Sequence, residues 1–106
     1  MTSRREKIEA MLSDDPKDVF LRYSLAMELA KEGELDDSVQ RLRELTKEDP
    51  PYVPAFFMAG QQLAQQSKVE EARTILREGI EEARQQGDLH AAGEMSEFLV
   101  TLGTAS

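Results

Sequence analysis

The sequence repeats itself with a period of 34 residues, and this repeat constrains the fold more than any other feature. Residues 19–52 align with residues 53–86 without a gap. Small, apolar and acidic positions coincide along the alignment: Val19 with Val53, Ala26 with Gly60, Leu29 with Leu63, Gly33 with Ser67, Ser38 with Ala72, and Leu42 with Leu76. Unrelated helical segments would not keep their small residues in register. The two segments are therefore predicted to be copies of one structural unit.

The composition indicates that this unit is helical. The chain of 106 residues is 40% hydrophobic, and it is rich in Ala, Leu, Glu, Gln and Arg, which are good helix formers. Runs of Val, Ile, Thr and Tyr that are typical of strands do not occur. We therefore expect one all-α domain over residues 1–106. Because the chain has no Cys, disulfides, thiol catalysis and cysteine metal sites are excluded.

Proline positions predict where several helices begin. Asp15-Pro16 is typical of a helix start, with Asp15 as the capping acid and Pro16 in the first turn. Pro54 lacks the amide hydrogen that an interior turn uses, so its helix is expected to begin near Val53 rather than at Pro50. The predicted helices cover residues 3–13, 18–32, 36–47, 53–66, 69–86 and 89–102. They would form a stack of antiparallel helix hairpins.

The repeat resembles the tetratricopeptide repeat (TPR), whose signature is W-x2-L-G-x2-Y, then A-x3-F, then P. The second unit matches with Phe56-x2-Ala59-Gly60-x2-Leu63 and then Ala72-x3-Leu76. The first unit matches with Arg22-x2-Leu25-Ala26-x2-Leu29, then Ser38-x3-Leu42, then Pro50. Two positions depart from the signature. Arg22 replaces the large aromatic residue, and Arg84 stands where the closing proline would fall, so the helix over 69–86 is expected to continue past it.

The resemblance divides the chain into a half-repeat helix (3–13), two repeats (19–52 and 53–86) and a capping helix (88–102). At the same offset, Ile8 matches Leu42 and Met11 matches Leu45. The first helix is therefore expected to be the second helix of a repeat whose first helix is missing. Each hairpin leaves an apolar face open, which the two flanking helices would cover. The resemblance implies a small bacterial-type TPR-like domain.

Few residues are suited to catalysis or metal binding. The one histidine, His90, is expected at the surface or near a helix cap, because no spacing typical of metal ligands accompanies it. Acidic pairs such as Glu70-Glu71 are explained by helix dipoles and solvation. Gly87 is expected to end a helix, and Gly93 to permit close helix packing. We therefore predict that the protein is not an enzyme and uses no cofactor or metal.

The net charge of −8 bears on the partner and the location. It disfavours nucleic acid, whose phosphates need a basic surface, and it disfavours anionic membranes. A basic or neutral partner is more compatible with this charge. The sequence contains neither a signal peptide nor an apolar run long enough to span a membrane, so a cytoplasmic location is expected.

The resemblance to TPR proteins also implies a binding surface. In these proteins the first helix of each hairpin lines a concave groove that holds a peptide or helix of a partner protein. Here the first helices are 18–32 and 53–66, with part of 89–102. Residues outside the packing pattern are the candidates for the groove: Phe20, Tyr23, Met27, Lys31, Phe57, Gln61 and Gln65, with Met58 beside them. The groove is predicted to be apolar and adaptable, as suits an interaction scaffold or adaptor.

Three further considerations concern the partner. TPR domains that clamp a C-terminal carboxylate use Lys and Asn on these faces, so an acidic tail is not expected here. In one alternative, Phe20 and Met27 only cover the terminal helices and Tyr23 is half-buried packing. In another, the protein is a self-association module, and the groove or the Phe98-Leu99-Val100 end pairs two copies in a homodimer.

Overall fold

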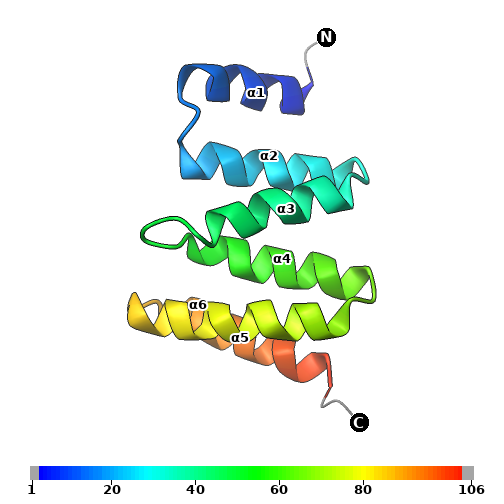
Figure 1. The fold of residues 1–106 in the computed structure, drawn as a ribbon, viewed down its shortest axis with the longest axis vertical. Helices are drawn as coiled ribbons and strands as arrows, with labels where there is room; N and C mark the ends of the chain where they lie inside the picture. Colours follow the sequence, from blue (N-terminus) through cyan, green and yellow to red (C-terminus); the bar gives the residue numbers. More distant parts are fainter. Residues whose placement is uncertain (1–2, 104–106) are drawn as a thin grey trace.

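The computed structural model describes residues 3–103; the ends of the predicted domain, residues 1–2 and 104–106, lie outside the described residues. Within 3–103 the chain forms six helices and no strand: α1 (Arg4–Asp14), α2 (Val19–Lys31), α3 (Leu35–Leu45), α4 (Val53–Gln65), α5 (Val69–Gln85) and α6 (Leu89–Thr101). Each helix packs against the next one in the chain, in a stack with extents of 47 × 29 × 19 Å (Figure 1). The predicted all-α hairpin stack is confirmed.

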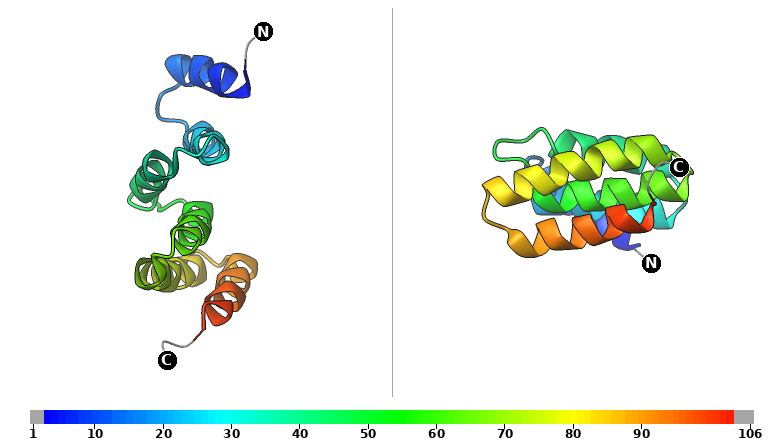
Figure 2. Two further views of the ribbon diagram at one scale, coloured as in Figure 1. Left: turned by 90° about the vertical axis from the view of Figure 1, so that its right-hand side faces the viewer. Right: turned by 90° about the horizontal axis from the view of Figure 1, so that it is seen from below.

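The helices from α2 onward lie in two layers. α2, α4 and α6 lie on one side of the stack, and α3 and α5 lie on the other (Figure 2). α1 packs against α2 at the N-terminal end of the stack. α4 packs against α3, α5 and α6, so it is the central helix.

The start of α2 differs from the prediction. The backbone N–H of Asp15 donates to the carbonyl of Met11 at 3.0 Å, so Asp15 ends α1. Pro16 favours an extended residue before it, and Asp15 has a φ of −141°. The residue that caps α2 is Asp18, whose Oδ1 accepts from the N–H of Leu21 at 2.9 Å. The prediction that Asp15 caps this helix and that Pro16 lies in its first turn is wrong.

The other helix ends follow the proline and glycine positions. α4 begins at Val53 with Pro54 in its first turn, as predicted. Gly87 ends α5 with a φ of +79°, a conformation that glycine adopts without a steric penalty. α5 continues past Arg84 to Gln85, in agreement with the missing proline.

The spacing of the helix starts changes at α6. α2 begins at Val19 and α4 at Val53, which is the 34-residue period. α6 begins at Leu89, 36 residues after Val53. The buried positions shift in the same way, since Met95 of α6 is buried like Ala59 of α4. α6 therefore packs like α4, but its equivalent positions come 36 residues later in the chain instead of 34.

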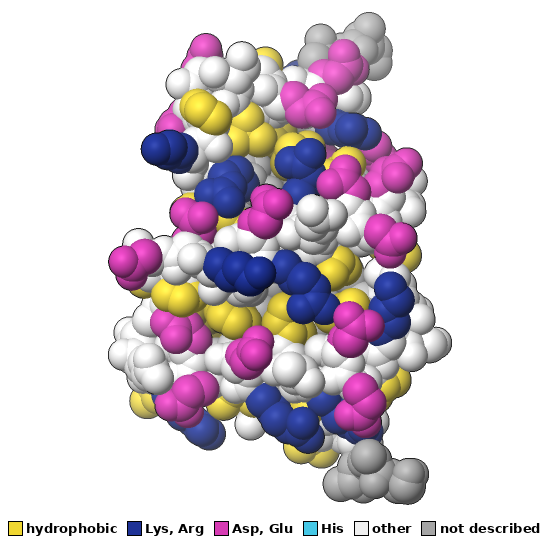
Figure 3. Space-filling view, in the orientation of Figure 1, with side chains coloured by type: hydrophobic (Ala, Val, Ile, Leu, Met, Phe, Trp, Pro, Cys, Tyr) yellow, Lys and Arg dark blue, Asp and Glu magenta, His cyan; other side chains and the backbone are white. Residues whose placement is uncertain are grey.

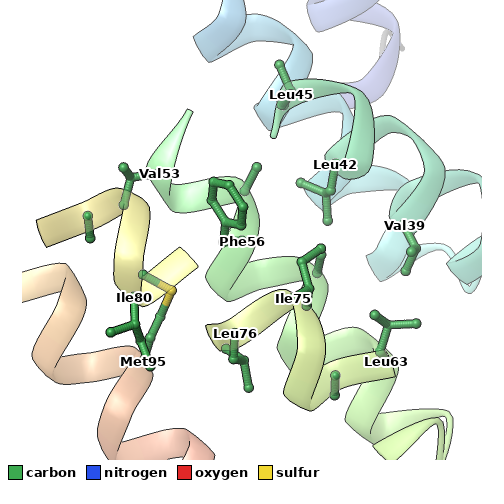
Figure 4. Packing of buried hydrophobic residues seen from close by; sticks show 14 of the residues in the cluster. Val39, Leu42, Leu45, Val53, Phe56, Leu63, Ile75, Leu76, Ile80 and Met95 are labelled. Atoms are coloured by element: carbon green, nitrogen blue, oxygen red, sulfur yellow. The ribbon is translucent and has the colours of Figure 1, made fainter. Parts of the chain in front are cut away.

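A continuous apolar core extends from α2 to α6 (Figure 4). Its helices approach closely at the small residues of the repeat. A Cβ atom added to Gly60 would lie 2.7 Å from Leu76 Cδ2, and one added to Gly79 would lie 2.5 Å from Phe56 Cβ. A separate small cluster, formed by Ile8, Leu25 and Leu29, joins α1 to α2.

Gly93 does not have the packing role that was predicted for it. No atom lies within 4 Å of a Cβ added at this position, and the residue is exposed. α6 packs on α5 through Ala92 and Met95, which are 5% and 0% exposed, so its other side faces away from the stack. The prediction that Gly93 permits close helix packing is wrong.

Candidate functional site

Three adjoining cavities follow α4 on the side where α2 and α6 lie. A loop cavity of about 340 Å³ lies at the start of α4, a central cavity of about 230 Å³ lies beside its middle, and an amide cavity of about 390 Å³ lies beside its second half. The loop and central cavities share Val53, Pro54 and Asp88. The central and amide cavities share Met58 and Gln61. We refer to the three cavities together as the groove.

The central cavity is the most apolar part of the groove. Side chains from α2, α4 and α6 line it: Tyr23, Val53, Pro54, Phe57, Met58, Gln61, Asp88, His90, Ala91, Glu94 and Met95. Tyr23 stacks edge-on against Tyr52, with ring centroids 5.5 Å apart. Phe57 makes a similar contact with Phe98 of α6, at 5.9 Å. These aromatic pairs fix the walls of the cavity and leave apolar surface between them.

Burial changes the acidity of the two tyrosines beside this cavity. It raises the pKa of Tyr23, and the neighbouring Tyr52 adds to the increase. Burial also raises the pKa of Tyr52, with a smaller contribution from the charge of Asp18. Both phenols therefore remain neutral to a higher pH than an exposed tyrosine would.

The loop cavity is built by the segment that joins α3 to α4. Prolines and acidic residues line most of it: Val19, Glu48, Asp49, Pro50, Pro51, Tyr52, Val53, Pro54, Gln86 and Asp88. Gln86 Nε2 donates to the carbonyl of Pro51 at 2.9 Å, which ties the loop to the end of α5. Asp88 Oδ1 accepts from the N–H of Ala91 at 3.0 Å and thereby caps α6.

The amide cavity contains three glutamines and no charged residue. It is lined by Met58, Gln61, Gln62, Ala64, Gln65 and Phe98. Gln62 is only 3% exposed, and neither its Nε2 nor its Oε1 has a hydrogen-bond partner among residues 3–103. A buried amide without partners is uncommon, because it loses its hydrogen bonds to water.

The structure brings together only some of the residues that the sequence predicted for a groove. Tyr23, Phe57 and Gln61 line the central cavity, and Gln61 and Gln65 line the amide cavity, together with Met58. The remaining three predicted residues, which are Phe20, Met27 and Lys31, line none of the three cavities. Phe20 is 63% exposed, and Lys31 Nζ lies 3.3 Å from Glu28 Oε2.

Other groove residues were not predicted from the sequence. Asp88 was not among the predicted groove residues, although it lines two of the cavities. Glu94 and Phe98 of α6 enter the groove because of the two-residue register change, which the 34-residue alignment does not contain. His90 is exposed as predicted, and its Nε2 lies 3.4 Å from Glu94 Oε1.

The opposite side of the stack differs from the groove in its charge. Basic and acidic side chains are interspersed on the face formed by α3 and α5 (Figure 3). A cavity of about 300 Å³ there is lined in part by two ion pairs. Arg43 lies 3.0 Å from Glu71, and Lys68 Nζ lies 3.9 Å from Asp36. The formal charges that line this cavity therefore neutralise one another.

Among residues 3–103, no three His, Asp or Glu side chains lie together as metal ligands would. None of the six described helices combines the length and the apolar character needed to cross a membrane.

Comparison with known proteins finds similar chains among curated proteins and among solved structures. No family model matches the sequence. A curated relative, the TPR repeat-containing protein PA0015 of Pseudomonas aeruginosa, is 26% identical over 100 residues, which cover 94% of this chain and 95% of that protein. The solution structure of protein BPP2914 from Bordetella parapertussis superposes with a TM-score of 0.81 and 29% identity, over 96% of this chain and 89% of that one. Together with the six-helix stack, these similarities indicate a TPR-like fold.

Proposed function

We propose that this protein is a non-enzymatic adaptor of the TPR family that holds a short segment of a partner protein in the groove along α4. The observation that carries the proposal is that the three cavities lie next to one another along α4 and share lining residues from one to the next. The name of the Pseudomonas aeruginosa relative supports a repeat protein, and such repeats present elongated surfaces to other proteins. In this proposal the protein is cytoplasmic, and neither nucleic acid nor a membrane is its partner.

The dimensions of the groove suit an extended peptide. α4 has 13 residues and therefore spans roughly 20 Å. An extended chain rises about 3.3 Å per residue, so about six residues of the partner would fit along the helix. The apolar central cavity would take one or two apolar side chains. A groove of this size is expected to give micromolar affinity, about −8 kcal/mol.

A peptide-display selection with 12-residue random sequences tests the proposal. The selected peptides are then titrated against the parent protein and against two variants. Gln61→Trp fills the junction of the central and amide cavities and should weaken binding at least tenfold. Gln85→Trp makes the same substitution at an exposed position of α5 and should leave binding unchanged. Failure to select any binder, or binders that ignore Gln61→Trp, would show that the groove is not a peptide site.

Self-association is a second candidate, and two exposed residues of α6 favour it. Leu89 and Val100 are 72% and 77% exposed, and a spacing of eleven residues places them on one side of the helix. Two copies that pack through this side would cover both residues. Light scattering over a range of protein concentrations tests this. A constant monomeric mass would exclude self-association, whereas a mass that rises with concentration and returns to that of the monomer with Val100→Asp would support it.

A further inference from the structure

We infer that the partner segment of the proposed groove is cationic: an extended chain that places a Lys or Arg beside Asp49 and Asp88, and an apolar side chain in the central cavity. This inference rests on the proposed function and specifies its ligand. It is carried by the charges that line the groove and by their position.

All formal charges that line the groove at neutral pH are negative. They belong to Glu48, Asp49, Asp88 and Glu94, and among residues 3–103 the lining includes neither Lys nor Arg. Of these four acids, Glu48 has an arginine partner, since Arg22 lies 3.4 Å from it. In the described part of the chain, Asp49 and Asp88 make no ion pair with Lys or Arg, and the only side chain paired with Glu94 is that of His90. Asp49 and Asp88 of the groove are therefore available to pair with a Lys or Arg of a partner.

The cavity on the opposite face does not share this excess. Its lining contains two carboxylates and two basic residues, and Arg43 lies 3.0 Å from Glu71 while Lys68 Nζ lies 3.9 Å from Asp36. Both carboxylates of that cavity therefore have a basic neighbour, whereas Asp49 and Asp88 have none among residues 3–103. A basic residue of a partner would pair with the carboxylates of the groove, as basic residues of the chain itself pair with carboxylates on the other face.

The charges also give the groove a direction. The acidic residues gather where α4 and α6 begin, and the amide cavity at the other end of α4 carries only neutral glutamines. A partner chain would therefore have its basic residue at one end of the bound segment and neutral residues at the other. The apolar residue for the central cavity lies between them.

The buried amide of Gln62 points to an extended main chain at the neutral end. It lines the amide cavity, and both its Nε2 and its Oε1 lack partners within residues 3–103. An amide offers donor and acceptor together, and a peptide bond of an extended segment supplies the matching pair. The occupant that fits both ends of the groove is thus a polypeptide rather than an isolated cation.

The charge preference is tested with capped six-residue peptides and fluorescence anisotropy at low and high salt. Each peptide has a Phe-Leu centre, flanked on one side by two Lys, two Gln or two Glu and on the other by two Gln, in both chain directions. At low salt, the tighter Lys peptide should bind at least tenfold more tightly than its Glu version, and the difference should shrink at high salt. Equal affinities, or tighter binding of the Glu peptide, would overturn the inference.

Matched variants locate the effect on the protein. Asp49→Asn with Glu94→Gln should weaken binding of the Lys peptide at least threefold, and binding of the Gln peptide by a clearly smaller factor. The control, Asp14→Asn with Glu81→Gln, makes the same change in charge at exposed positions outside the groove lining. Asp88 is left intact because it caps α6. An equal loss in both variants would assign the effect to net charge and overturn the site.

The outcomes separate this inference from the proposed function. If the peptides bind regardless of their charge but do not bind the Gln61→Trp variant, the groove is supported and the cationic partner is contradicted. If the peptides bind the Gln61→Trp variant as tightly as the parent protein, both the groove and the cationic partner are contradicted. Gln62→Met tests the main-chain contact, because Met keeps the length and loses both hydrogen bonds. Binding of the Lys peptide should fall about fivefold, and unchanged binding would refute that contact.

Discussion

The two single helices at the ends of the stack are held in different ways. α6 shares the continuous core, where Met95 lies beside Ile80 of α5 with 0% of its surface exposed (Figure 4). Arg73 of α5 is also buried, and it donates to the carbonyls of Leu102 and Gly103 at 3.2 and 2.7 Å. The end of α6 is therefore fastened through both apolar packing and charge-assisted hydrogen bonds.

α1 is held by a smaller apolar contact and by surface charge. Ile8 is its one buried residue, in the small cluster with two leucines of α2. Two ion pairs join the same helices: Arg4 Nε lies 3.1 Å from Glu28 Oε1, and Arg5 lies 2.7 Å from Glu32. Pairs with exposed members contribute little to stability, so most of the attachment depends on Ile8.

This difference shows which end of the stack the groove depends on. α6 supplies part of the wall of the central cavity, so its position defines the groove. Within residues 3–103, α1 packs mainly on α2 and lines none of the three cavities. We therefore expect changes at α6 to affect the whole domain, and changes at α1 to remain local.

Truncation of Met95 should have the largest effect. Met95→Ala leaves a void between α5 and α6 and is expected to lower the free energy of unfolding by about 2–5 kcal/mol. Urea denaturation followed by circular dichroism measures this loss. Leu89→Ala on the same helix is the control and should change stability by less than about 0.5 kcal/mol, since Leu89 is 72% exposed. Similar losses for both variants would mean that α6 is not part of the core.

Two helical glycines give an opposed pair of substitutions. Gly79→Ala would place a Cβ 2.6 Å from Met95 Sδ and should cost about 1–3 kcal/mol by overpacking. Gly93→Ala meets no atom within 4 Å and should stabilise α6 by about 0.5–1 kcal/mol, because alanine favours helix. Thermal unfolding of both variants provides the comparison. Destabilisation by Gly93→Ala would contradict the open outer side of α6.

Truncation at the other end should have a smaller and local effect. Ile8→Ala is expected to cost no more than about 2 kcal/mol, the low end of the range for such truncations, because α1 can detach while the rest stays folded. Hydrogen exchange measured residue by residue should show loss of protection in α1 alone. Faster exchange spread evenly over α1 to α6 would show that the two ends are equally coupled to the core.

The repeat was sufficient to predict the helix stack because its small residues lie where two helices cross closely. Ala26 and Ser38 are fully buried at one crossing, where Ser38 Oγ donates to the carbonyl of Ala26 at 2.6 Å. The register of α6 does not follow from the 34-residue repeat, and its start at residue 89 was predicted instead from Gly87, which ends the helix before it. This register depends on how far α5 continues beyond Arg84 and on the short turn that follows, and both lie where the repeat ends.

The candidate groove residues show the same limit. Tyr23, Phe57 and Gln61 were predicted because they lie outside the packing pattern of the repeat, and they line the central cavity. Phe20 was predicted on the same ground, yet it is exposed and lines none of the three cavities. Asp88 was not predicted as a groove residue: its capping of α6 is a local property, whereas its place between two cavities follows from the packing of α6 beside α4.

Added salt should weaken the attachment of α1 slightly more than the attachment of α6. Raising the ionic strength from 0.05 M to 1 M screens the ion pairs between α1 and α2, so the free energy that holds α1 in place should fall by less than about 1 kcal/mol. The last turn of α6 should change less, because Arg73 is 6% exposed and its acceptors there are carbonyls. Hydrogen exchange at the two salt concentrations measures both ends together. Greater loss of protection in α6 than in α1 would reverse the comparison.

The two tyrosines test whether loosening of α1 reaches the groove. Tyr23 and Tyr52 are the only tyrosines, so the tyrosinate absorbance reports this contact alone. Burial raises the pKa of both phenols, which keeps them neutral in the folded protein above their ordinary pKa of 10.0, while the unfolded chain ionises. The contribution of the two buried phenols to the free energy of unfolding is therefore fully present below pH 10 and is lost as the pH rises above it. Ile8→Ala should leave this titration unchanged, whereas a lower midpoint in that variant would show that the attachment of α1 supports the groove.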